Sequence, residues 1–189
     1  MENKIIFTGP VGAGKTTAIN SVSDIMVVAT DDGTQIKNNT AVAMDYGILN
    51  LEGGGRVHLY DTSGQDCFSS MWEILSKGAM GVVILIDNAS PAPLVDLEFY
   101  LKAFSKPITQ SGNAVVVGVT RSEFGMQNDL DFTRTVLSTQ IDLLAQFNGR
   151  LSSLKLNIPV FEVDGRKRED VMQLLLALFA LLDPRTSRI

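Results

Sequence analysis

The sequence predicts an α/β fold built on a mostly parallel sheet with helices on both faces. Residues 81–86 and 114–119 are continuously apolar runs, which is typical of strands buried on both faces. These runs alternate with stretches whose apolar residues recur at helical spacing. Alternating strands and helices form a parallel sheet with right-handed crossovers. Because no linker or repeat interrupts the order, we expect a single domain over residues 1–189.

Each expected element rests on a local signal. Strands are indicated by short apolar runs or by strict alternation, and helices by apolar residues three and four positions apart. The triple glycine at 53–55 turns the chain back and makes one antiparallel hairpin, whereas residues 23–39 hold no period and are expected to form a long loop. The expected strands are 4–8, 42–48, 57–61, 81–86, 114–119 and 159–163. One helix is expected to begin at Lys15, and four more are expected over 68–75, 94–104, 137–147 and 171–182.

Composition and charge exclude several classes of protein. With 16 Lys and Arg against 21 Asp and Glu, the net charge of −5 argues against a general nucleic-acid binder. The single cysteine excludes an intrachain disulfide. The longest apolar stretch, 171–182, is shorter than the about 20 residues that a spanning helix needs. We therefore expect a cytoplasmic protein without integral membrane association.

Residues 9–16 read GPVGAGKT and fit the pattern G-x-x-x-x-G-K-[ST] between a strand and a helix. Glycine permits the backbone angles that turn successive N–H groups toward phosphate oxygens, and the helix that follows adds its positive end. Lys15 would reach the β- and γ-phosphates, and the Thr16 hydroxyl would bind Mg²⁺. The alternative is a glycine-rich turn with a chance lysine. The candidate nucleotide contacts here are Gly12, Ala13, Gly14, Lys15, Thr16 and Thr17.

A second motif, Asp61-Thr62-Ser63-Gly64-Gln65, follows the next buried strand. An aspartate at a strand end can hold Mg²⁺, Gly64 can bring a backbone N–H to the γ-phosphate, and Gln65 can orient an attacking water. Alone, such a pattern is also consistent with an ordinary turn. In combination with the phosphate loop, it indicates a nucleoside triphosphatase.

Several segments together resemble the small Ras-like P-loop GTPases, and within them the bacterial branch of mutual-gliding (MglA-type) and roadblock-associated proteins. This resemblance implies a three-layer P-loop NTPase fold with a six-stranded, mostly parallel sheet and one antiparallel edge strand. It also implies a GTP/GDP switch in which Thr40, rather than the competing Thr34, binds Mg²⁺ beside Thr16 and Asp61. A roadblock-domain protein is the partner that the resemblance suggests. The matching pieces are GPVGAGKTT, TAVAMDYG, LYDTSGQD, MWEILSKGAMGVVILIDN, VVGVT and PVFEVDGR.

The chain departs from the family pattern at the residues that would read the base. Thr120-Arg121-Ser122-Glu123 stands where the family has Asn-Lys-x-Asp. Glu123 could pair with the guanine edge, Arg121 could lie over the base, and Thr120 could hydrogen-bond the phosphate loop. The later base-contact loop aligns with Asp164-Gly165-Arg166, where the Gly165 N–H could meet the guanine O6.

A further departure is Val11, where most of the family has glycine beside the γ-phosphate. A branched side chain there would crowd the catalytic water, so we expect slow hydrolysis, with Lys15 and Gln65 as the catalytic residues. The leading function is thus a GTP-binding switch with slow Mg²⁺-dependent hydrolysis, in bacterial polarity, motility or signalling. The alternatives are an ATP-dependent P-loop enzyme and a nucleotide-bound scaffold that does not hydrolyse. Asp87, at the end of a strand, is expected to be a cap or turn residue rather than a catalyst.

Overall fold

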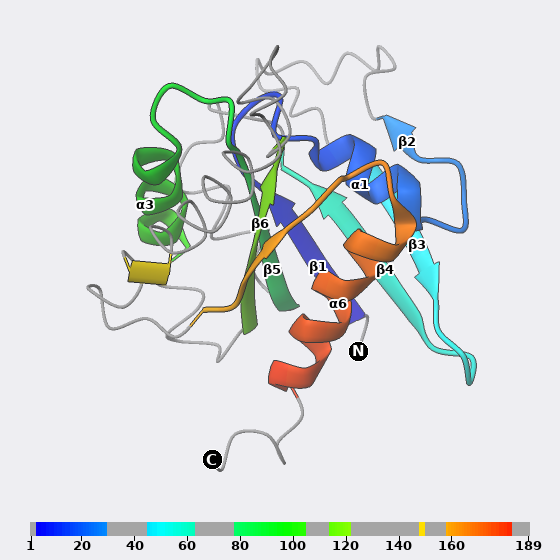
Figure 1. Cartoon of the computed structure of the whole chain (residues 1–189). Helices are drawn as coiled ribbons and strands as arrows, with labels where there is room; N and C mark the ends of the chain where they lie inside the picture. The colour runs from blue at the N-terminus through cyan, green and yellow to red at the C-terminus, as the bar shows by residue number, and fades with distance from the viewer. Residues whose placement is uncertain are drawn as a thin grey trace, which may run out of the picture.

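A central sheet of seven strands, in the order β2-β3-β4-β1-β5-β6-β7, forms the middle of the structure (Figure 1). The computed structural model describes residues 3–29, 45–62, 78–104, 114–121, 148–149 and 158–182. The strands are β1 (Asn3–Thr8), β2 (Val28–Ala29), β3 (Asp45–Asn50), β4 (Arg56–Asp61), β5 (Ala79–Asp87), β6 (Ala114–Thr120) and β7 (Val160–Glu162).

The strand directions confirm the predicted fold class, an α/β fold of the P-loop NTPase type. Strand β1 runs parallel to β4 and β5, and the parallel order continues through β6 to β7. The hairpin predicted at the triple glycine joins β3 to β4 in antiparallel register. Strand β2 lies within the run that the sequence predicts as a loop, and it adds one short antiparallel strand outside β3. Two residues are too few for a periodic pattern, which explains why the sequence does not reveal it.

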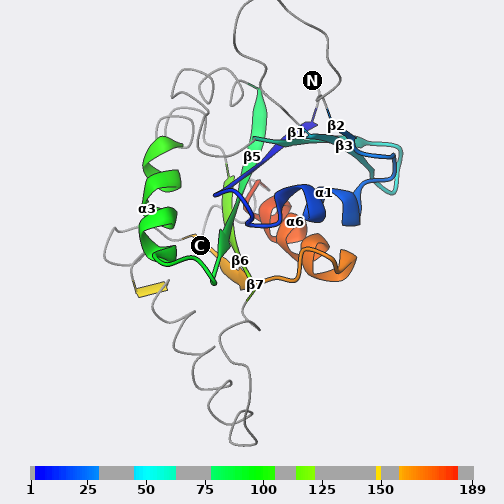
Figure 2. The same ribbon diagram turned by 90° about the horizontal axis from the view of Figure 1, so that it is seen from above.

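Helices cover both faces of the sheet. Figure 2 shows helix α1 (Lys15–Val22) and helix α6 (Arg168–Leu182) on one face and helix α3 (Pro93–Ala103) on the other. This is the three-layer arrangement that strands with two apolar faces require. The helices expected over 68–75 and 137–147 lie outside the described residues. Within the described part of the chain, no helix is both long and apolar enough to cross a membrane.

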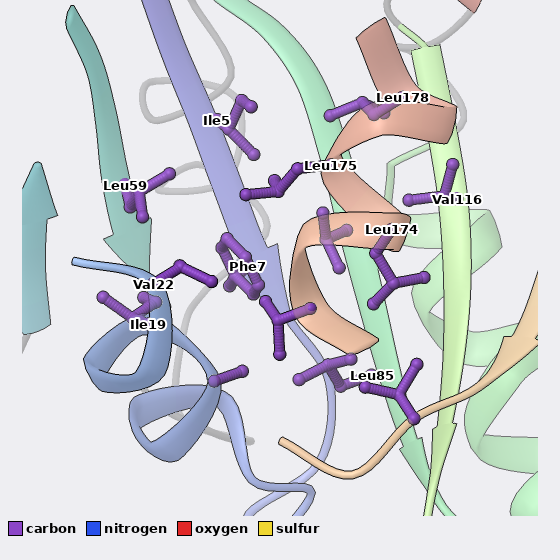
Figure 3. Packing of buried hydrophobic residues seen from close by; sticks show 14 of the residues in the cluster. Ile5, Phe7, Ile19, Val22, Leu59, Leu85, Val116, Leu174, Leu175 and Leu178 are labelled. Atoms are coloured by element: carbon purple, nitrogen blue, oxygen red, sulfur yellow. The ribbon is translucent and has the colours of Figure 1, made fainter. Parts of the chain in front are cut away.

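Two clusters of buried apolar side chains, one on each face of the sheet, pack the helices against the strands. On the α1 and α6 face, the fully buried side chains of Leu174, Leu175 and Leu178 from α6 pack against Phe7 of β1 and Val116 of β6 (Figure 3). On the other face, α3 places Leu97, Tyr100 and Leu101 against alternate residues of β5 and β6. Since successive strand residues point to opposite faces, the continuously apolar strands serve both clusters.

The carboxyl ends of the parallel strands meet at one edge of the sheet. Phe7 of β1 is in register with Asp61 of β4, and Asp87 of β5 is in register with Thr120 of β6. The backbone N–H of Thr62 continues this contact by donating to the carbonyl of Phe7 at 3.0 Å. Open α/β sheets bind ligands outside this edge. The fold therefore brings the ends of β1, β4, β5 and β6 to one place.

Candidate nucleotide-binding site

The loop between β1 and α1 is built on glycines with left-handed backbone angles. Gly9, Gly12 and Gly14 have φ values of 141°, 83° and 87°. At Gly9 a side chain is also excluded by space, because an added Cβ would lie 2.0 Å from the carbonyl oxygen of Leu85. The N–H of Ala13 donates to the carbonyl of Pro10 at 3.2 Å and curves the loop. We refer to this curved loop, residues 9–14, as the cradle. This geometry is the one that the glycine pattern of the sequence predicts.

Lys15 begins α1, and its side chain turns back into the cradle. It is 6% exposed, and its Nζ donates to the carbonyl of Pro10 at 3.1 Å. The same Nζ lies 3.9 Å from Oδ1 of Asp61. This buried ammonium, held by a loop carbonyl and a carboxylate, is placed to meet a phosphate that enters the loop.

Thr16 and Asp61, which the sequence predicts as metal ligands, are neighbours in the structure. Oδ2 of Asp61 lies 3.1 Å from Oγ1 of Thr16, and Asp61 is 5% exposed. Its other oxygen, Oδ1, is buried and has no hydrogen-bond partner within the described ranges. A hydroxyl and an unsatisfied carboxylate oxygen are hard oxygen donors of the type that Mg²⁺ prefers.

Burial controls the protonation of Asp61. Desolvation raises the pKa of its carboxyl from 3.8 to about 6, although the charge of Lys15 and the hydroxyl of Thr16 pull the pKa down. The negative charge of Asp45 raises the pKa further. A cation at this site would relieve the desolvation of the carboxylate, so the ionised form is the one that a metal would favour.

Asp45 is a site residue that the sequence reasoning missed. Its Oδ2 accepts a hydrogen bond from the Thr16 hydroxyl at 2.5 Å. Asp45 is the first residue of β3, and the antiparallel register that pairs Tyr46 with Tyr60 brings the start of β3 beside the end of β4. The sequence alternation predicts an apolar face with Tyr46 and Ile48 and places Asp45 on the opposite face. This prediction is wrong, because the buried residues of β3 are Gly47 and Leu49, which lie on the same face as Asp45. Knowledge of the hairpin register would have been the signal that identifies Asp45.

On the other side of the loop, the end of β6 is tied to the cradle. As expected, Thr120 contacts the phosphate loop, since its hydroxyl donates to the carbonyl of Ala13 at 3.0 Å. The guanidinium of Arg121 donates to the carbonyl of Gly12 at 3.0 Å and also pairs with Asp87. Both residues line a cavity of about 470 Å³ together with Thr17 and the segment after β7.

The segment Asp164-Gly165-Arg166 also lines this cavity. The guanidinium of Arg166 grips both carboxylate oxygens of Asp164 at 2.8 Å, and these hydrogen bonds, together with one from the Arg166 backbone N–H, lower the pKa of Asp164 to about 2. The loop approaches the cradle closely, because a Cβ added at Gly165 would lie 3.3 Å from the carbonyl oxygen of Gly14. Gly165 thus lies beside the phosphate loop, and the base contact that the resemblance implies for this segment stays a prediction.

The remaining predicted site residues are not covered by the structure. Thr40, Gly64, Gln65 and Glu123 lie outside the described residues. Within the described part of the chain, no group of three or more His, Cys, Asp or Glu side chains gathers to hold a metal. The candidate metal donors that the structure does bring together are Thr16, Asp61 and the additional Asp45.

Together, the fold and this site define a nucleotide-binding P-loop protein. A glycine cradle, a buried lysine, a hydroxyl and a strand-end carboxylate occupy the positions that such proteins use for a triphosphate.

Comparison with known proteins agrees with this class. The chain belongs to the family of CobW/HypB/UreG nucleotide-binding domains, whose model matches residues 3–155. This range contains the phosphate loop, Asp61, Thr120 and Arg121, whereas Asp164 and its neighbours lie beyond it.

Similar individual proteins include Ras-related proteins and an intraflagellar transport protein. The chain is 26% identical to Ras-related protein Rab-13 of Mesocricetus auratus over 149 residues, which is 77% of this chain and 66% of that protein. It is 22% identical to Ras-related protein SEC4 of Saccharomyces cerevisiae over 185 residues, or 96% of this chain and 75% of the relative. Identity reaches 30% with the intraflagellar transport protein 22 homolog of Rattus norvegicus, over 55% of this chain and 57% of that protein. The chain therefore spans about two thirds to three quarters of the Rab-13 and SEC4 relatives, and the family match makes it a nucleotide-binding P-loop domain.

Proposed function

We propose that this protein is a GTP-binding switch that hydrolyses GTP slowly with the help of Mg²⁺. The observation that carries the proposal is the convergence of Lys15, Thr16 and Asp61 at the mouth of one glycine cradle. Lys15, which donates to the Pro10 carbonyl, would exchange that contact for phosphate oxygens when a triphosphate binds. The Ras-related relatives support a nucleotide-hydrolysing activity for this site.

The residues present fit a magnesium ion. The buried Oδ1 of Asp61, with no hydrogen-bond partner among the residues described, and the Thr16 hydroxyl beside it are the oxygen donors that would hold the ion, with Thr40 as the expected third. When bound, magnesium would neutralise charge on the β- and γ-phosphates. Asp45 accepts a hydrogen bond from the Thr16 hydroxyl, so magnesium binding would have to release this contact or share it.

Guanine is the base that we propose for this cavity, and the expected contact with Gly165 supports it. A backbone N–H at Gly165 would match the oxygen at position 6 of guanine and would meet an amino group in adenine. Arg166 engages both oxygens of the Asp164 carboxylate, which makes Asp164 a poorer candidate than Glu123 for reading the base. We assign that task to Glu123, with Arg121 as the surface over which the base lies.

Slow hydrolysis follows from the loop residue Val11. Its side chain is 74% exposed at the cradle, where it would crowd a water that Gln65 has to place. Unassisted turnover near the about 10⁻⁴ s⁻¹ of Ras-type proteins, or below it, is the expected rate. A partner would then supply an arginine or position Gln65, and the resemblance to the bacterial branch suggests a roadblock-domain protein.

The switch would work through two segments that the γ-phosphate orders. Thr40 and Gly64 are the residues proposed to sense it, one in each segment, and hydrolysis would release both. The bacterial setting in polarity, motility or signalling belongs to this proposal, as does a cytoplasmic location.

Calorimetric titration of nucleotide-stripped protein with GTP and with ATP, in magnesium buffer, tests the proposal. We expect GTP to bind with micromolar affinity or tighter and ATP to compete poorly. The sequence Thr120-Arg121-Ser122-Glu123, in place of the usual guanine signature, favours the alternative of an ATP-dependent enzyme, and preferential ATP binding would support it. Single-turnover phosphate release with and without a roadblock partner addresses the second alternative, because no release in either case would indicate a scaffold. Absence of heat with both nucleotides would overturn the proposal.

A further inference from the structure

Arg121 holds an unusual backbone conformation at the point where β6 enters the candidate site. Its φ of 55° makes it the only non-glycine residue with positive φ within the described ranges. Such a conformation costs about 1 kcal/mol or more for a residue with a Cβ, and it persists only when surrounding contacts hold it. The contacts of the Arg121 side chain therefore have to stabilise this backbone conformation.

Two arms of the Arg121 guanidinium reach two different parts of the fold. Nη2 donates to the carbonyl of Gly12 at 3.0 Å, and Nη1 pairs with Oδ2 of Asp87 at 3.0 Å. The planar guanidinium thus links the phosphate loop to the end of β5. Lysine, with one compact ammonium group, does not offer this fixed two-pronged geometry.

Asp87 is itself firmly placed. The residue is 8% exposed, and its second oxygen, Oδ1, accepts the backbone N–H of Ala89 at 2.9 Å. The next residue, Asn88, donates its N–H to the carbonyl of Thr120 at 3.0 Å, which joins the ends of β5 and β6. The predicted turn role of Asp87 is confirmed by its bond to Ala89, but its other oxygen is directed at Arg121.

The arginine that Asp87 holds is part of the wall of the base cavity. Arg121 lines the cavity of about 470 Å³ together with Gly165, and its side chain is 48% exposed. We propose that Asp87 is a positioning residue for the nucleotide: it fixes the Arg121 side chain as the surface on which the purine base lies. This inference rests on the proposed nucleotide-binding function and extends it to a residue outside the motifs that carry that function. The base would then be recognised by stacking on Arg121, with the triphosphate held separately by the cradle.

Asp87→Asn separates this role from that of a turn residue. An asparagine keeps an oxygen that can accept the Ala89 N–H, but it lacks the charge that pairs with Arg121. A second variant, Arg121→Lys, keeps the charge and loses the fork. Asp96→Asn serves as the matched control, since the Asp96 carboxylate accepts a hydrogen bond from Ser90 at 2.6 Å in the neighbouring loop and helix.

Each variant is first stripped of nucleotide. It is then titrated by calorimetry, in magnesium buffer, with GTP and separately with inorganic tripolyphosphate. We expect Asp87→Asn and Arg121→Lys each to weaken GTP binding about tenfold, the effect of removing a charge-assisted contact. Tripolyphosphate has no base, so its affinity should change by less than about twofold, and Asp96→Asn should alter neither ligand. The double variant should lose little more than either single variant, because both changes break the same contact.

The outcomes are distinct. Unchanged GTP affinity in Asp87→Asn overturns the inference, and so does an equal loss for GTP and tripolyphosphate, which indicates a general structural role. Urea unfolding of each variant identifies a folding defect, and a loss of GTP affinity that merely follows the loss of stability counts against the inference. If the parent protein binds neither ligand, the proposed function itself fails, whereas a parent that binds GTP with no effect of the variants refutes only the role of Asp87.

Discussion

In protein free of nucleotide and magnesium, the buried carboxyl of Asp61 is predicted to lower stability at neutral pH. Desolvation raises the pKa of this group from 3.8 to about 6, and Lys15 and Thr16 offset the rise only in part. Between pH 3.8 and about 6 the folded protein therefore retains a proton that the unfolded chain has already released, and at neutral pH the folded protein holds an unfavourable buried charge. Replacing the residue with asparagine, which is neutral at every pH, is predicted to remove this penalty.

The direction and size of the effect follow from the two pKa values. The stability contributed by the retained proton is fully present below pH 3.8 and is lost as the pH rises through about 6. A difference of about two pKa units corresponds to about 3 kcal/mol, a substantial part of the roughly 5–15 kcal/mol that stabilises a typical domain. Asp61→Asn should thus be more stable than the parent by up to about 3 kcal/mol at neutral pH, and nearly equal to it near pH 4.

Urea unfolding of the parent and of Asp61→Asn, in EDTA between about pH 4 and about pH 7, measures this difference. Asp96→Asn, another change of carboxylate to amide, is the control and should follow the parent. If Asp61→Asn is less stable than the parent at neutral pH, or if the two profiles run parallel, the reasoning is refuted. Adding magnesium and GTP should stabilise the parent far more than the variant, since the ion needs the ionised oxygen.

Three further predictions concern neighbouring positions. Gly9→Ala would place a methyl 2.0 Å from a carbonyl oxygen of β5 at a φ of 141°, and should cost about 2–5 kcal/mol in urea unfolding; Gly53→Ala, with φ 101° but open space, should cost less, and equal losses would contradict the steric argument. Val11→Gly should speed single-turnover GTP hydrolysis about tenfold by making room for the water, as measured by phosphate release, and an unchanged rate would show that Val11 does not limit it. Asp45→Asn removes a negative charge beside Thr16 and should weaken magnesium binding to the GTP complex about fivefold in a metal titration, whereas equal affinity would exclude Asp45 from the metal site.

The cradle was predictable because its requirements are local. Gly9, Gly12 and Gly14 need unusual backbone angles, and Lys15 and Thr16 follow them directly in the chain. A pattern of consecutive residues can therefore encode this half of the site. The strand-end position of Asp61 was predictable in the same way, since a strand with buried Val57 and Leu59 leads into it.

The positions of Asp45 and Asp87 depend on which strands are neighbours and in what register. Asp45 reaches Thr16 only because β3 pairs with β4, and Asp87 reaches Arg121 only because the ends of β5 and β6 coincide. Neither register can be predicted from a pattern of consecutive residues. The same holds for β2, whose two residues form a strand only because β3 lies beside them.

Helix α6 supplies much of the support beneath the cradle although it comes last among the described elements. During synthesis β1, β5 and β6 leave the ribosome before Leu174, Leu175 and Leu178 exist to cover them. Apolar strands left uncovered in this way are prone to aggregate. We therefore expect nascent chains that stop before residue 168 to need chaperone protection, and nucleotide to be captured only after release of the complete helix.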